Sequence, residues 1–168
     1  MIAPTFKKTL DLRRHLQDAF NVTTGHDHDG VNSASVSVNI VSPHVQYFQI
    51  EDLAANGDIA ARALLECPTG YAITLTSAKI ISQGSPTGID DSNTSVFLLA
   101  NGSNAIVSKT FNTTVTFPAA NTTVSLGTLS ATYKVMAAGD LLKFSLTNGT
   151  TADTPLCSIQ IGYTMVAA

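Results

Sequence analysis

The spacing of apolar side chains predicts one amphipathic helix, in residues 5–20. Leu12, Leu16 and Phe20 recur at intervals of four residues, and charged side chains occupy the other side. The polar run that leads to Gly25 ends this pattern. Because a helix of this length and modest amphipathicity is marginal alone in water, we expect it to pack on its own domain, on a sister subunit or on a scaffold.

The next segment, residues 25–43, is linker-like. Gly, Asp, Asn and Ser dominate its first part, and Val36-Ser37-Val38-Asn39-Ile40 then alternates strictly between apolar and polar side chains. This alternation predicts a short, half-exposed strand, which Pro43 interrupts. A strand so far from the body of the protein is suited to pairing with another chain.

From His44 onward, short runs of strand-forming residues alternate with turn signals. Asn101-Gly102, between residues 95–99 and 105–109, favours the turn of a β-hairpin. The other strands are expected at residues 45–50, 59–66, 71–81, 114–117, 123–126, 133–136, 141–146 and 157–165, with a long loop at residues 84–93. About eight to ten short strands at this spacing predict an all-β fold, a jelly-roll-like β-sandwich.

At 168 residues, the chain is long enough for one domain with a substantial core. We therefore expect an N-terminal amphipathic helical arm (1–24), an extended linker (25–43) and one β-sandwich domain (44–168). The first residues do not form a charged segment followed by an apolar one, and no apolar run approaches the ~20 residues that span a bilayer. The sequence thus predicts no signal peptide, no membrane span and synthesis in a cytoplasm.

Charged residues make up 12% of the chain, against ~25% in ordinary soluble domains. A surface this poor in charge must be covered by Thr, Ser, Asn and Gln or by a partner, which favours a subunit over an isolated monomer. Residues 1–20 carry four basic and two acidic side chains, a net charge of +2, whereas residues 21–168 carry five basic and ten acidic ones, a net charge of −5. The arm is suited to docking on an acidic surface, but the basic residues are too few for a nucleic-acid interface.

The densest chemistry lies in Gly25-His26-Asp27-His28-Asp29-Gly30. In an extended segment, His26 and His28 share one face, and the two carboxylates lie on the other. Two imidazoles do not complete a coordination sphere, but three chains around a threefold axis would offer six nitrogen ligands to a transition metal. The second interpretation is an exposed polar turn, shaped by the glycines and by hydrogen bonds of the Asp side chains.

The rest of the chain has no recognisable catalytic pattern. A nucleophile elbow, a phosphate-binding glycine loop and a zincin helix are all missing from the sequence. The adjacent acids in Glu51-Asp52 and in Asp90-Asp91 point to opposite faces of an extended chain, so neither pair forms a convergent acid-base site. We expect no enzyme activity and no required cofactor, and we expect Asp90-Asp91 to be solvated loop carboxylates rather than a Ca²⁺ site.

The remaining reactive side chains are expected to have structural roles. His15 and His44 are interpreted as ordinary surface or partly buried residues, and Asp140 as a residue that shapes the turn before a strand. Cys67 and Cys157 lie in apolar settings, where they either form a disulfide or stay reduced as small core residues.

The helical arm, the linker Gly-His-Asp-His-Asp-Gly-Val-Asn-Ser (residues 25–33) and the Thr- and Val-rich β region together resemble small virion proteins of tailed bacteriophages, especially capsid decoration (cement) and head-fibre proteins. The Gly-His-x-His core at residues 25–28 is similar to a segment of phage fibre and tail proteins in which His-x-His from three chains holds a metal. For this chain the resemblance implies Fe, Zn or Ni at His26 and His28 on a trimer axis. Gly139-Asp140-Leu141-Leu142 also resembles the corresponding turn and strand of phage and viral jelly rolls.

The resemblance implies a non-enzymatic, trimeric decoration protein that binds the capsid exterior and stabilises the shell against internal DNA pressure. It would be made in the cytoplasm of the bacterial host, and its partners would be its own copies, the major capsid protein or other virion proteins. The arm and residues 31–42 would reach across to neighbouring subunits.

Two other functions stay open at this point. A tail or fibre adaptor that binds a receptor or a carbohydrate should display exposed aromatic rings, whereas we expect most Tyr and Phe side chains to lie in the core. A zinc- or iron-dependent hydrolase would use His26 and His28 for turnover, and it predicts that assembly survives their replacement.

Overall fold

The computed structural model describes residues 42–167, which form strands and their connecting loops. The strands are β1 (Ser42–Ile50), β2 (Ile59–Glu66), β3 (Tyr71–Ser82), β4 (Ser95–Asn101), β5 (Asn104–Phe111), β6 (Thr123–Ser125), β7 (Val135–Met136), β8 (Leu141–Asn148) and β9 (Cys157–Ala167). Within this part of the chain, no helix is long and apolar enough to cross a membrane.

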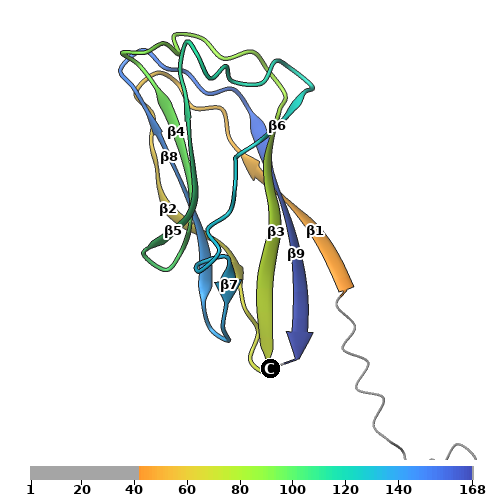
Figure 1. Ribbon diagram of the computed structural model, residues 1–168. Coiled ribbons are helices and arrows are strands. Elements are labelled where there is room, and N and C mark those ends of the chain that lie inside the picture. The colour runs from red at the N-terminus through yellow and green to blue at the C-terminus, as the bar shows by residue number, and fades with distance from the viewer. Residues whose placement is uncertain (1–41, 168) are drawn as a thin grey trace, which may run out of the picture. The chain divides into compact units, whose positions relative to one another are not determined.

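The strands form two antiparallel sheets that face each other in a β-sandwich-like arrangement (Figure 1). One sheet has the strand order β1-β9-β3-β6, and β7 pairs with β3 on the same side as β6. The other sheet has the order β2-β8-β4-β5. The chain crosses between the sheets at most connections, so strands that pair, such as β1 and β9, lie far apart in the sequence.

Alternating burial explains why these residues form strands. In β8, Leu142, Phe144 and Leu146 are buried, whereas the side chains between them are partly exposed. Strand β3 alternates in the same way until a bulge at Thr76 shifts its phase, after which Ala78 is buried. The all-β prediction is thus confirmed, with strands close to nearly all the expected positions.

Four phenylalanines form a cluster within the hydrophobic core. The ring of Phe97 lies 5.6 Å from that of Phe111, 5.7 Å from that of Phe117 and 5.8 Å from that of Phe144, measured between centroids. All four side chains are almost completely buried. Burial of a side chain of this size contributes about 1.5–3 kcal/mol, so the cluster is a major source of stability.

A small buried polar cluster lies near the end of β8. The hydroxyls of Ser95 and Thr154 both donate to the side-chain oxygen of Asn148, at 2.7 and 2.8 Å. The Nδ2 atom of Asn148 is buried and has no partner within the described residues. The two hydroxyl bonds therefore hold the Asn148 oxygen in the interior, where an unpaired acceptor would be costly.

The strand predicted at residues 114–117 is wrong, because this segment is a loop. The side-chain oxygen of Asn112 accepts hydrogen bonds from the backbone N–H groups of Thr114 (3.0 Å) and Val115 (2.7 Å). Such an Asx turn diverts the backbone from a sheet ladder. The apolar residues at 114–117 belong instead to a loop that places Phe117 in the core.

Two turn predictions need a shift. The hairpin of β4 and β5 is confirmed, but Asn101 pairs with Asn104, so the loop consists of Gly102 and Ser103. Gly102 takes the positive φ of 61° that this turn requires. Pro43 lies inside β1 rather than ahead of the strand, and an edge strand tolerates proline because one side of it needs no N–H donor.

Three sequence predictions fall outside the described residues. These are the helix at residues 5–20, the strand at residues 36–40 and the placement of His26 and His28.

Candidate assembly surface

The histidines predicted as metal ligands, His26 and His28, lie outside the described residues, as does His15. Within residues 42–167, no group of three or more His, Cys, Asp or Glu side chains is placed to hold a metal ion. His44 instead stacks on the ring of Tyr163 in the neighbouring strand β9, with the ring centroids 5.1 Å apart. It is partly buried, in agreement with the role expected for it.

Asp90 and Asp91 shape the long loop between β3 and β4. One oxygen of Asp90 accepts from the backbone N–H groups of Asn93 (2.7 Å) and Ser92 (2.8 Å), and these bonds lower the pKa of Asp90 below its usual value. Asp91 accepts from the backbone N–H of Thr113 at 3.2 Å. The two carboxylates therefore stabilise different loop segments.

Asp140 shapes the turn before β8, as its position in the sequence predicted. Its carboxylate accepts from the backbone N–H of Ala137 at 2.9 Å and from the side-chain amide of Asn101 at 3.1 Å. The second bond joins this turn to the end of the β4–β5 hairpin, so Asp140 has a structural role.

The two cysteines are free and buried. Burial raises the pKa of the Cys67 thiol, and it raises the pKa of Cys157 to about 12. The sulfur of Cys67 donates to the backbone carbonyl of Tyr71 at 3.2 Å. Thiols that remain protonated and inaccessible are poor nucleophiles, so both residues belong to the core.

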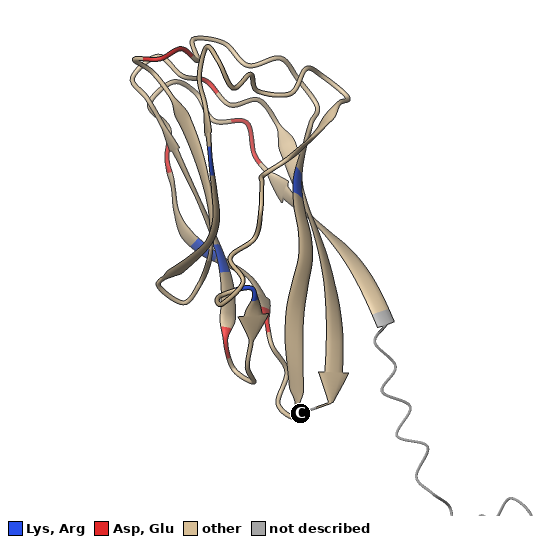
Figure 2. Cartoon of the chain, viewed as in Figure 1, with Lys and Arg blue, Asp and Glu red and all other residues tan. Residues whose placement is uncertain are grey.

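The outer surface of the sheet formed by β1, β9 and β3 has almost no charge, and we call it the uncharged face. Lys79 is the only Lys, Arg, Asp or Glu in these three strands, and Figure 2 shows them nearly free of charged positions. Strand register and alternation place these side chains on the uncharged face: Pro43, Val45, Tyr47, Gln49, Ala72, Thr74, Ser77, Lys79, Ile81, Ser158, Gln160, Thr164 and Val166.

Several large apolar side chains of the uncharged face are open to solvent. Val45 is 56% exposed and Tyr47 is 59% exposed. Next to this face, Val135 of β7 pairs with Thr74 and is 47% exposed. The hydroxyl of Tyr47 accepts from the side-chain amide of Gln160 at 3.1 Å. Exposed apolar side chains on a surface without charge are typical of protein–protein contacts.

Negative charge gathers instead at one end of the two sheets, in the loops at residues 51–58, 83–94 and 149–156. These loops contain six acidic side chains and no basic one. They contact one another, because Leu53 pairs with Thr154 and Thr87 pairs with Asp153. The uncharged face is therefore a property of three strands and not of the whole described surface.

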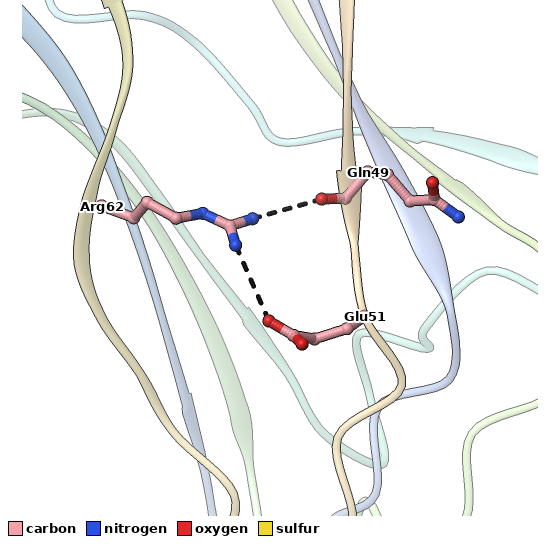
Figure 3. Close-up of polar contacts among 3 residues, drawn as sticks. All are labelled: Gln49, Glu51 and Arg62. Atoms are coloured by element: carbon pink, nitrogen blue, oxygen red, sulfur yellow. Dashed lines mark hydrogen bonds and ion pairs between the residues drawn. The ribbon is translucent and has the colours of Figure 1, made fainter.

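An arginine joins the edge strands of the two sheets (Figure 3). Arg62, in β2, donates from Nη2 to the backbone carbonyl of Gln49 in β1 at 3.2 Å. Its Nη1 atom lies 3.6 Å from a carboxylate oxygen of Glu51. Both charged side chains are largely exposed, so their ion pair contributes little stability. Because Arg62 belongs to the other sheet, the Gln49 carbonyl that it binds points away from β9. This bond therefore marks the side of β1 that pairs with no strand of the described residues.

A groove of about 490 Å³ borders the uncharged face at the bulge of β3. It lies between β6 and β7, which pair with different parts of β3. Its lining mixes apolar residues (Leu75, Ala78 and Leu129) with residues that carry a hydroxyl group (Thr74, Thr76, Ser77, Ser125 and Thr128) and Lys134.

The sequence reasoning missed the exposure of the tyrosines. We expected most aromatic residues in the core, but Tyr47, Tyr71 and Tyr133 are all exposed. No local signal marked Tyr47 as exposed, because the alternate sets Val45-Tyr47-Gln49 and Gln46-Phe48-Ile50 are equally apolar. No protein-family model and no curated protein sequence matches the chain.

Proposed function

We propose that the β region is a jelly roll. Both β6 and β7 pair with the same edge of β3, so together they count as one interrupted strand. The strand orders β1-β9-β3-β6 and β2-β8-β4-β5 then support a two-sheet, eight-strand Greek-key arrangement, which is frequent in viral capsid and lectin domains.

We infer that the chain is a non-enzymatic structural protein of a tailed-phage virion, a decoration protein that binds the capsid exterior and stabilises the shell. The uncharged face is the observation that carries this proposal, because a surface with Val45 and Tyr47 exposed and only Lys79 charged is suited to permanent contact with protein. The arm and the linker resemble small virion proteins of tailed bacteriophages, and this resemblance is the reason for proposing a phage capsid as the assembly.

The uncharged face is the proposed contact between copies in a trimer. The amphipathic arm, a helix at residues 5–20 in this proposal, and residues 31–41 reach neighbouring subunits or the major capsid protein, since Ser42 already belongs to β1. His26 and His28 of three copies hold one metal ion on the threefold axis. Repeated weak contacts of this kind gain strength through multivalency on a lattice.

Light scattering on the full chain tests the trimer. One chain has a mass of 17.6 kDa, and we expect a species of three chains that the double variant Val45→Glu/Tyr47→Glu dissociates. Thr147→Glu is the matched control, because Thr147 is an exposed residue of β8 on the outer surface of the other sheet. A monomeric wild type, or a trimer that survives the double variant, would contradict the proposed interface.

Elemental analysis of the same species tests the metal. We expect about one Fe, Zn or Ni ion per trimer, lost in the variant His26→Ala/His28→Ala. A metal-free trimer would remove the axial metal from the proposal and leave the uncharged face in place. Co-sedimentation with heads of a tailed phage that encodes this sequence tests the capsid partner, and failure to bind would refute the decoration role.

A receptor-binding adaptor is the second candidate, and the exposed rings of Tyr47, Tyr71 and Tyr133 favour it. Tyrosine rings stack on sugars, and the nearby groove with its hydroxyl groups offers hydrogen-bond partners. Binding to a glycan array that is lost in Tyr133→Ala would support this function over decoration.

A further inference from the structure

The free edge of β1 has backbone groups that are not used within the described residues. Strand β1 pairs with β9 on one side and ends the sheet on the other (Figure 1). The carbonyl of Gln49 points to the free side, because it accepts from Arg62 of β2. Since both backbone groups of a strand residue point the same way and alternate along the strand, Val45 and Tyr47 also present their N–H and C=O groups to the free side.

Pro43 supports this assignment independently. It shares the alternation of Val45 and Tyr47, and it pairs in register with Thr164 of β9. A proline has no N–H group, so it fits a position whose N–H would point away from the neighbouring strand. The side chains of Val45 and Tyr47, both more than half exposed, flank the same edge on the uncharged face.

This edge lacks the features that usually prevent pairing with another chain. Natural edge strands carry charged side chains, prolines or bulges. Strand β1 has no Lys, Arg, Asp or Glu, its pairing with β9 has no register shift, and its proline lies at the second residue. The stretch from His44 to Tyr47 is therefore an open acceptor for an added strand.

On the basis of the proposed assembly role, we propose that residues 36–40 of a second copy of this chain pair with the free edge of β1 at Val45 and Tyr47. The segment Val36-Ser37-Val38-Asn39-Ile40 has no charge and no proline, and its alternate side chains are apolar. When it is added as a strand, one of its faces packs Val36, Val38 and Ile40 beside the exposed side chains of the acceptor.

The occupant is a second copy because residues 36–40 of the same chain cannot pair with both Val45 and Tyr47. Residues 42–44 already extend in β1 and pair with β9, so only Val41 separates Ile40 from the strand. A hairpin needs a loop of at least about two residues between its paired strands. The tightest turn in the same molecule, at residues 40 and 41, would place Val36 opposite Val45 and leave no residue of the segment to pair with Tyr47.

Val45→Pro tests the backbone pairing. This change removes an N–H that points to the free edge and keeps the bonds between β1 and β9. We expect the concentration for half-dissociation of the oligomer to rise by roughly tenfold or more. Circular dichroism checks that the variant is folded, and unchanged association of a folded Val45→Pro would overturn the proposal.

Cysteine cross-linking is a second test that does not depend on the proline variant. A chain with Val38→Cys is mixed with a chain with Val45→Cys or Tyr47→Cys and oxidised mildly. Each chain carries one added cysteine, so a disulfide between added cysteines always joins two molecules. We expect a disulfide-linked pair with one of these two partners. A chain with Thr147→Cys is the control and should give none.

The outcomes separate this proposal from the assembly role. A wild-type oligomer without cross-linking to β1 overturns the strand pairing and leaves the assembly role intact. A chain with Tyr47→Cys that links only to itself overturns it in favour of pairing between two β1 strands. A monomeric wild type without cross-links overturns both the pairing and self-assembly.

Discussion

Gly88 and Gly102 provide a matched pair of substitutions that separates backbone strain from steric conflict. Both glycines have a left-handed backbone, with φ of 66° and 61°. A side chain in this conformation costs about 1–2 kcal/mol. A Cβ atom at Gly102 would meet nothing within 4 Å. We therefore expect Gly102→Ala to lower the free energy of unfolding by about 1–2 kcal/mol, from strain alone.

At Gly88 the same change meets the backbone of Thr151. The added Cβ would collide with the carbonyl oxygen of Thr151 and lie 2.8 Å from its carbonyl carbon. Backbone atoms cannot rotate away, so the loop at residues 83–94 must move. The hydrogen bond from the Thr151 hydroxyl to the Gly88 carbonyl (3.1 Å) and that from the Asp153 N–H to the Thr87 carbonyl (2.9 Å) would weaken. Overpacking of this kind costs about 1–3 kcal/mol beyond the strain.

Urea unfolding of both variants, followed by circular dichroism, measures this difference. We expect Gly88→Ala to lose about 2–5 kcal/mol in total, clearly more than Gly102→Ala. The two variants share the same chemical change, so effects of alanine on the unfolded chain cancel. Equal losses, within about 0.5 kcal/mol, would refute the inferred contact between these loops.

Three further predictions concern the interior. Phe97→Ala should destabilise the fold by about 3–5 kcal/mol in urea unfolding, because it empties the centre of the aromatic cluster, whereas a loss below about 1 kcal/mol would contradict that packing. Thr154→Val should cost about 1–3 kcal/mol, since it removes one donor to the buried oxygen of Asn148; calorimetry that shows no loss would disprove the need for this bond. Cys157 has a folded pKa of about 12, above its unfolded value, so its stabilising effect is complete below about pH 9 and is lost as the pH rises towards 12, by roughly 1.4 kcal/mol per pH unit. Unfolding measured between pH 9 and 11 should therefore show a weaker pH dependence in Cys157→Ala, and identical slopes would refute this assignment.

Most strands could be predicted because each is a local pattern. Alternation in residues 141–146 and the turn signal at Asn101-Gly102 require no knowledge of the partner strand. The same local reasoning failed at residues 114–117, where Asn112 forms a turn and the apolar side chains serve the core from a loop. It also failed for the tyrosines, since membership of a strand does not say which of its sides is covered.

The candidate assembly surface was only partly predictable. The low charge of the whole chain indicated a partner, but an amino-acid composition does not say where on the surface that partner binds. The location of the uncharged face depends on the order of strands in the sheet, which brings β1 beside β9 and β9 beside β3 although they are far apart in the sequence. The open edge at Val45 and Tyr47 likewise follows from the place of β1 at the end of that order.

The amino-acid sequence by itself determined the all-β class, the positions of most strands, the hairpin turn and the scarcity of charge, because these depend on side-chain alternation and composition over a few residues. Only the tertiary structure decided which strands pair, which face of each strand is buried and which edge stays open. These depend on contacts between residues as distant as Tyr47 and Gln160, and a local pattern contains no information about such partners.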